Sequence, residues 1–310
     1  MERFRGSRAV MRAAPVAVVT AALGLGLFAQ AAVARPTGQG TRGVTAVAAT
    51  GAAEGRIASA QAGANRITIT ARDFAFDAPP TLPTGVSAFT LINNGAEDHH
   101  GELLRLNDGV TPEQFGQAFS GSPDAVFALI TDEGGPGTVN PGGTGNDVFL
   151  DLKAGNYLLV CFIAGDDGIP HIAKGMVQPI TVVPPSTTAQ APQSSATIDM
   201  FDFGYTIPQL SAGQQTLKIT NSGPQAHEFD VMQIPDDVTP EQLAAALQAM
   251  GPPPFPTTQI SGFNGINAGG TGWLSLNLSA GTYVALCFIP DAATGKPHVE
   301  LGMVQPFRVQ

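Results

Sequence analysis

The sequence predicts an all-β protein built from two tandem antiparallel β-sandwiches, each with a short inserted helix. The chain has 310 residues, which is enough for about two domains. Its 37 glycines and 25 prolines are well above average usage and indicate many turns between short strands. The decisive observation is a repeat, because the same order of strand-like segments, turns and helix start occurs twice along the chain.

Residues 1–34 have the features of a secretory signal peptide. Arginines precede an apolar stretch at 15–29, and Ala32-Val33-Ala34 supplies the small residues of a cleavage site. We therefore expect a protein that is secreted or held in the cell envelope. The alternative is an uncleaved anchor, because the apolar stretch is close to the length that spans a bilayer. The protein would contact a membrane only in that case.

Composition sets the expected domain boundaries. Residues 35–64 are rich in Ala, Gly and Thr without apolar periodicity, which is typical of a disordered stalk. Residues 184–196 are a Pro/Ser/Thr stretch with little to bury, which indicates a linker. The two folded domains are expected at 65–183 and 197–310.

Both halves begin with the same local signals. The alternating segments at 89–95 and 217–223 each end in an Asn-containing turn and predict a strand. Thr111 and Thr239 are each followed by Pro and, three residues on, by Gln, which predicts a capped helix start.

The second part of each half repeats as well. A strand with apolar residues on one face is expected at 148–152 and at 274–278, followed by a glycine hairpin turn and an apolar strand that leads to a cysteine. The last strands are expected at 177–183 and 304–309.

Each half also contains the same set of potential metal ligands. In the first half Cys161 is followed by His171 after nine residues and by Met176 after four more. The second half repeats this order with ten residues between Cys and His, and one upstream histidine precedes each set, four residues after a glycine. The eight candidate ligands are His99, Cys161, His171 and Met176, and His227, Cys287, His298 and Met303.

Two imidazoles, a thiolate and a weak thioether are the ligands of a blue-copper electron-transfer site. The chain has five histidines and two cysteines, and of these only His100 falls outside the pattern. We expect His100 to be solvated. A disulfide between Cys161 and Cys287 is the alternative use of the cysteines, but they occupy equivalent positions in two separate domains.

The segments CFIAGDDGIPHIAKGMVQPITV and CFIPDAATGKPHVELGMVQPFRV resemble the C-terminal loop and last strand of cupredoxins, the blue-copper family. This resemblance implies two Greek-key β-sandwiches with one type 1 copper ion each. It makes the histidines and cysteines equatorial ligands, with Met176 and Met303 axial. It also implies that the imidazole edges of His171 and His298 are exposed and that a redox partner protein docks beside one of them.

The sequence departs from that family in three ways, the first of which is the inserted helix, which is not part of the minimal fold. The loop from Cys to His is longer than in plastocyanin. The residue after the first histidine is His100 in one half and Glu228 in the other, where the family commonly has Asn.

Several function classes are disfavoured. The formal net charge of −10 argues against nucleic-acid binding, which needs clustered Lys and Arg. No histidine lies beside Cys161 or Cys287 to pass electrons to a second copper, and only His100 is left over for such a centre. We therefore expect that the chain is not an enzyme.

The function expected from the sequence is single-electron transfer by an exported protein with one copper site per domain. Two alternatives stay open. One is sequestration or delivery of copper in the cell envelope by the same ligands. The other is a metal-free interaction module that uses the cysteines and histidines as core residues.

Overall fold

The computed structural model describes residues 64–121, 123–185, 188–249 and 253–310. The expected signal peptide at 1–34 and nearly all of the expected stalk at 35–64 lie outside the described residues. None of the helices in the described part of the chain has the length and hydropathy that a membrane span requires.

The first domain consists of short strands with one α-helix and two 3-10 turns, η1 and η2. In chain order these are β1 (Asn65–Arg72), β2 (Ala75–Asp77), β3 (Thr81–Pro83), β4 (Gly85–Asn93), β5 (Glu102–Leu106), α2 (Pro112–Gly121), η1 (Pro123–Leu129), β6 (Ile130–Asp132), β7 (Asp147–Leu152), β8 (Gly155–Val160), η2 (His171–Lys174) and β9 (Val177–Val183).

The second domain repeats this order, although its described residues include no counterpart of β3 or η1. Its elements are β10 (Ala196–Phe201), β11 (Gly204–Thr206), β12 (Gly213–Asn221), β13 (His227–Ile234), α3 (Pro240–Gln248), β14 (Thr258–Ile266), β15 (Thr271–Leu278), β16 (Gly281–Leu286), η3 (His298–Leu301) and β17 (Val304–Val309). The predicted all-β class with one short inserted helix in each half is therefore confirmed, and both final strands have the expected bounds.

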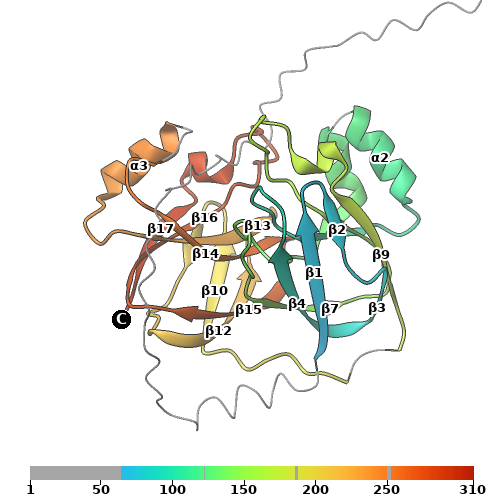
Figure 1. Cartoon of the computed structure of the whole chain (residues 1–310), viewed down its shortest axis with the longest axis horizontal. Coiled ribbons are helices and arrows are strands. Elements are labelled where there is room, and N and C mark those ends of the chain that lie inside the picture. Colours follow the sequence, from blue (N-terminus) through green and yellow to red (C-terminus); the bar gives the residue numbers. More distant parts are fainter. Residues whose placement is uncertain (1–63, 122, 186–187, 250–252) are drawn as a thin grey trace, which may run out of the picture.

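The two halves share one sheet (Figure 1). Eight strands run in the order β11-β10-β12-β15-β7-β4-β1-β2, so that four come from each domain. In the first domain this sheet is faced by β3-β9-β8-β5-β6, and in the second by β14-β13-β16-β17. Strand β1 pairs with β4 in parallel, as β10 does with β12 and β3 with β9, so the expectation of antiparallel sandwiches is wrong at these three pairs.

The seam between the domains is a regular strand pairing. Trp273 of β15 lies opposite Phe149 of β7, followed by two more residue pairs in antiparallel register. A second contact joins the backbone around Pro136 to that around Phe263, where Gly137 N donates to Gly262 O over 3.0 Å. The chain thus forms one continuous structure, which the repeat in the sequence did not reveal.

The hydrophobic core follows from strand alternation. In β7 the side chains of Val148, Leu150 and Leu152 are buried while Asp151 is exposed, because successive residues point to opposite faces of a sheet. The main core cluster contains residues of both domains, including Phe263, so the two sandwiches pack against each other.

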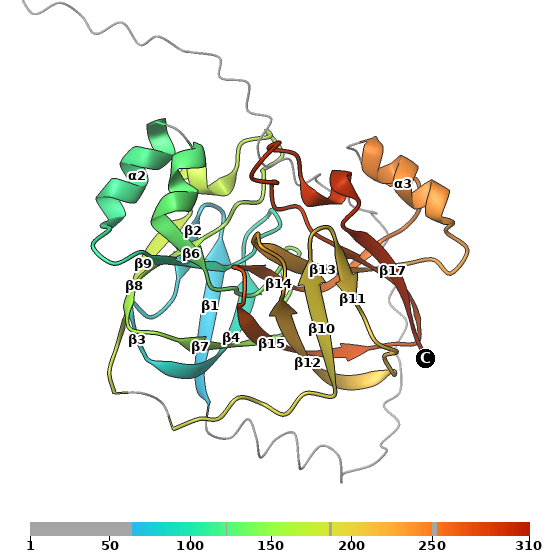
Figure 2. The ribbon, with the colours of Figure 1, turned by 180° about the vertical axis from the view of Figure 1, so that it is seen from behind.

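The two helices begin as the sequence predicts. Thr111 Oγ1 accepts a hydrogen bond from Gln114 N, and Thr111 N donates to Gln114 Oε1 over 2.8 Å. Thr239 and Gln242 form the same capping box at α3. Figure 2 shows that α2 and α3 lie at one end of the molecule, where the η2 and η3 turns also lie.

Candidate metal centres

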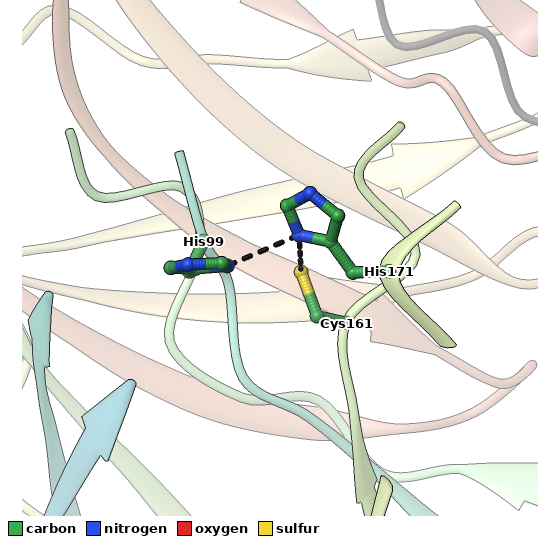
Figure 3. A group of neighbouring side chains, drawn as sticks. All are labelled: His99, Cys161 and His171. Atoms are coloured by element: carbon green, nitrogen blue, oxygen red, sulfur yellow. Dashed lines mark hydrogen bonds between the residues drawn. The ribbon is translucent and has the colours of Figure 1, made fainter. Parts of the chain in front are cut away.

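The first candidate centre brings together His99, Cys161 and His171 (Figure 3). His99 Nδ1 lies 3.1 Å from His171 Nδ1, and Cys161 Sγ lies 3.5 Å from the same nitrogen. All three side chains are fully buried. One donor from a distant segment and two from a single loop therefore point at one common position.

The second candidate centre has nearly the same geometry. His227 Nδ1 lies 3.1 Å from His298 Nδ1, and Cys287 Sγ lies 3.4 Å from His298 Nδ1. These side chains are also fully buried, and both cysteines are free. The alternative of a disulfide is therefore wrong for this structure.

The first histidine of each centre is positioned by an asparagine turn. The Asn93 side-chain amide donates to Glu97 O and to Val139 O, both over 2.8 Å, and its oxygen accepts from Gly95 N. His99 is then held by backbone hydrogen bonds with Val139. Asn221 makes the corresponding bonds before His227. The selection of His99 rather than His100 as the partner of His227 is consistent with this geometry.

The cysteine and the second histidine come from one loop. Cys161 directly follows β8, and its carbonyl accepts a hydrogen bond from Ile172 N over 2.8 Å. His171 N donates to Ile163 O over 2.9 Å, which closes the loop and places the imidazole over the thiol.

The two methionines follow the second histidines in the chain and are joined to the same loops by backbone hydrogen bonds. Met176 N donates to His171 O, and Cys161 N donates to Met176 O. The η2 turn ends at Gly175 with φ of 97°, a left-handed conformation that favours glycine and reverses the chain toward the core. Met303 makes the same bonds after Gly302, and both methionine side chains are fully buried. This placement suits the axial role that the resemblance implies.

In each centre a carboxylate is hydrogen-bonded to the Nε2 atom of the first histidine, the outer nitrogen that faces away from the other donors. His99 Nε2 lies 3.1 Å from Asp73 Oδ1, and His227 Nε2 lies 2.6 Å from Asp202 Oδ1. Both aspartates sit in the turn after the first strand of their domain. They are not among the predicted site residues, although the repeated Asp-Phe pair at 73–74 and 202–203 is a signal for them. Such a bond fixes the tautomer and ring orientation of a metal-binding histidine.

The close approach of carboxylate and imidazole requires a glycine. A Cβ atom at Gly223 would lie 2.7 Å from His227 Nε2 and 2.9 Å from Asp202 Oδ1. Gly95 faces Asp73 and His99 in the same way. These two positions are the glycines of the repeated turns before the first histidine.

The second histidines are not exposed, so this expectation is wrong. His171 and His298 are both fully buried. The ring of Phe74 covers His171 edge-on with a centroid distance of 5.2 Å, and Phe203 covers His298 at 4.9 Å. The turn between the first two strands of each domain folds over the centre, which the sequence pattern alone does not reveal.

His100 is buried rather than solvated, which also corrects the expectation. Its Nε2 accepts a hydrogen bond of 2.8 Å from Phe162 N, next to the cysteine. Burial lowers the pKa of His100 to about 3, so the ring is neutral and able to accept. Glu228 takes the same role toward Phe288 N over 2.5 Å. Both residues therefore hold the backbone beside a cysteine ligand.

Burial favours the uncharged forms of His99, His227, His298 and both cysteines. It raises the pKa of the Cys161 thiol to about 12 and raises that of Cys287, and it lowers the pKa of His298 to about 4. The pKa values of His99 and His227 are lowered by the same cause. The imidazoles are thus ready to coordinate, and an ion must displace the thiol proton.

The donor set fits copper. Within each centre the three donor atoms lie within 4.8 Å of one another. An ion with bonds of about 2.0 Å to nitrogen and about 2.3 Å to sulfur, the lengths of first-row metal sites, fits between donors that are 3.1 to 3.5 Å apart. One thiol, two imidazoles and a thioether suit both oxidation states of copper.

Comparison with solved structures gives matches to copper proteins. A dithionite-reduced auracyanin from the photosynthetic bacterium Roseiflexus castenholzii is 25% identical over 39% of this chain and 99% of that chain, with a TM-score of 0.26. A multicopper oxidase is 16% identical over 79% of this chain and 88% of that chain, with a TM-score of 0.22. A copper nitrite reductase from Nitrosomonas europaea is 16% identical over 79% of this chain and 93% of that chain, with a TM-score of 0.24. No protein-family model and no curated protein matches the chain.

The fold is cupredoxin-like. Because these TM-scores are low, this assignment rests on the strand order of the chain itself and on its two His-Cys-His groups. The expectation that the chain is not an enzyme is wrong as stated, because the matched structures include a multicopper oxidase and copper nitrite reductases, which are enzymes.

Proposed function

We propose that this chain is an exported carrier of single electrons that holds one type 1 copper ion in each domain. The observation that carries the proposal is the duplication of one buried triad, with the same Nδ1 to Nδ1 distance of 3.1 Å in both domains. When bound, copper supplies a reversible change of one unit of charge. The first centre is His99, Cys161, His171 and Met176, and the second is His227, Cys287, His298 and Met303.

The role of the chain is to keep these ligands in place when the charge changes. The outer nitrogen of each first histidine is bonded to an aspartate, and the backbone beside each cysteine is bonded to a buried side chain. Full burial excludes water from the ligands. A rigid and dry ligand set reorganises little, which is the property that fast electron transfer needs.

We also propose that an unidentified redox partner docks near His171 or His298. Ile169 is 46% exposed beside the first of these and provides an apolar contact. Since Phe74 and Phe203 cover the two imidazoles, the partner would meet these rings or the loop rather than the histidines themselves. Export through the segment at 1–34 is part of the same proposal.

Sequestration of copper is the second candidate function. The observation that favours it is that all eight candidate ligands are fully buried, which hinders loss of a bound ion. In that case the centres would keep Cu(I) and exchange electrons slowly.

The experiment that tests the proposal loads the protein with Cu(II) and records its visible spectrum. We expect an intense thiolate-to-copper absorption that one electron per ion bleaches and an oxidant restores. Cys161→Ser and Cys287→Ser should each remove one part of the absorption, and the double variant should remove all of it. A colourless loaded protein would contradict the proposal, and slow exchange with a coloured site would favour sequestration.

A further inference from the structure

The two centres differ in the contact made by the outer nitrogen of their second histidine. In the first centre His171 Nε2 lies 2.9 Å from Glu97 Oε2. In the second centre His298 Nε2 is buried and has no hydrogen-bond partner among the described residues. The difference comes from one position, because Glu97 and Gln225 each stand two residues before the first histidine of their domain.

Gln225 is fully engaged elsewhere. Its Nε2 donates to Asp202 Oδ2 and to Asp291 Oδ1, each over 3.0 Å, and its Oε1 accepts from Ala292 N over 2.8 Å. Asp291 therefore faces the amide of Gln225 and not the imidazole. The second centre has one carboxylate on its histidines, whereas the first centre has two.

The other charges beside the first centre do not remove this difference. Lys174 lies 4.4 Å from the ring centroid of Phe74, and its Nζ is 2.7 Å from Asp167 Oδ1, so this cation has its own carboxylate. Asp73 and Asp202 are equivalent and contribute to both centres alike. Glu97, with a side chain 22% exposed, bonds an imidazole directly, whereas the buried Asp291 beside the second centre bonds Gln225 and Thr294 instead.

A carboxylate bonded to a coordinating imidazole makes that imidazole a stronger donor. A stronger donor stabilises the more highly charged, oxidised ion and lowers the reduction potential of the site. We propose that Glu97 makes the two centres unequal, so that the first has the lower reduction potential and a single electron shared between them resides at the second. This rests on the proposed function. One electron leaves the first centre and enters the second, and no other reactant is consumed.

The fold places both centres in one body. Strands β7 and β15 pair across the seam, and the eight-stranded sheet is continuous. Glu102 of β5 also lies against the second domain, because a Cβ atom at Gly265 would lie 2.8 Å from Glu102 Oε1.

The test uses the full chain with one centre at a time. Cys287→Ser retains the first centre and Cys161→Ser retains the second, and each loaded variant is titrated potentiometrically on its thiolate-to-copper absorption. We expect the first centre to be the weaker electron acceptor by at least tenfold in equilibrium constant, about 59 mV for a one-electron couple. Adding Glu97→Gln to the first-centre variant should raise its reduction potential by a similar amount. It should also shift the energy of the thiolate-to-copper absorption.

Asp166→Asn is the matched control, because it removes one negative charge near the first centre and leaves Lys174 paired with Asp167. The Asp166 side chain is exposed, so we expect a change of less than threefold. Equal potentials in the two centres, or an unchanged potential in Glu97→Gln, would overturn the inference while leaving coloured, reducible sites intact. Colourless variants would instead refute the proposed function, and the inference with it.

Discussion

The aspartates behind the first histidines give the sharpest expectation about metal affinity. Asp202→Asn and Asp73→Asn each keep the shape of the side chain and remove its negative charge. In the wild type the carboxylate to Nε2 distance is 2.6 Å at Asp202 and 3.1 Å at Asp73. The Asp202 side chain is 22% exposed and that of Asp73 is 36% exposed, so solvent screens the second contact more.

Loss of such an outer contact weakens metal binding by about 10- to 100-fold. This range corresponds to about 1.4 to 2.7 kcal/mol of binding free energy. Because its contact is shorter and less exposed, we expect Asp202→Asn to lie at the upper end and Asp73→Asn near tenfold. Ala96 N and Glu97 N also donate hydrogen bonds to Asp73 Oδ1. The side-chain oxygen of an asparagine can still accept both bonds, so the turn should persist.

The assay is a competition titration of Cu(II) against a chelator of known affinity, followed by the thiolate-to-copper absorption. Asp202→Asn is measured together with Cys161→Ser, and Asp73→Asn together with Cys287→Ser, so that each titration reports one centre. Affinities within threefold of the parent variants, or a larger loss for Asp73→Asn, would refute the view that these carboxylates orient the histidines.

Three further expectations follow from the packing. Gly223→Ala should weaken copper binding at the second centre by at least tenfold, because its Cβ would lie 2.7 Å from His227 Nε2; a chelator titration that finds unchanged affinity would contradict this. Burial raises the pKa of Asp230 to about 7, so its contribution to the stability of the metal-free protein is complete below about pH 4 and is lost as pH rises through 7. Asp230→Asn should therefore reduce the fall in unfolding free energy between pH 5 and 7 by up to about 1.4 kcal/mol per pH unit in urea titrations, and an unchanged slope would argue against it. Phe263→Ala at the seam should lower the free energy of unfolding by about 3 to 5 kcal/mol and shift one common unfolding transition. Two separate transitions, of which only one moves, would show instead that the domains unfold independently.

The fold class could be predicted from the sequence because the signals for strands, helix starts and turns are local. Alternation in 148–152, the capping box at Thr111 and the glycine turns each depend on neighbouring residues, and each is found in the structure. The candidate ligands could be predicted from the sequence for the same reason, since Cys161, His171 and Met176 follow one another on a single loop.

What the sequence did not reveal depends on contacts between distant segments. The pairing of β7 with β15 joins two regular strand edges, and neither edge has a motif that names its partner. Separate turns meet above the first centre. This brings the ring of Phe74 over His171 and the Glu97 carboxylate within hydrogen-bond distance of His171 Nε2. Polarity alone suggested that His100 was solvated, but its ring meets a backbone donor in the interior.

X-ray absorption at the copper edge of the loaded protein tests most directly whether each domain binds an ion through its own cysteine and two histidines. We expect two ions per chain, each with one short thiolate sulfur bond and two imidazole nitrogens, and loss of the short sulfur signal in the Cys161→Ser, Cys287→Ser double variant. A spectrum without sulfur ligands, or one that the double variant leaves unchanged, would contradict the assignment of both centres.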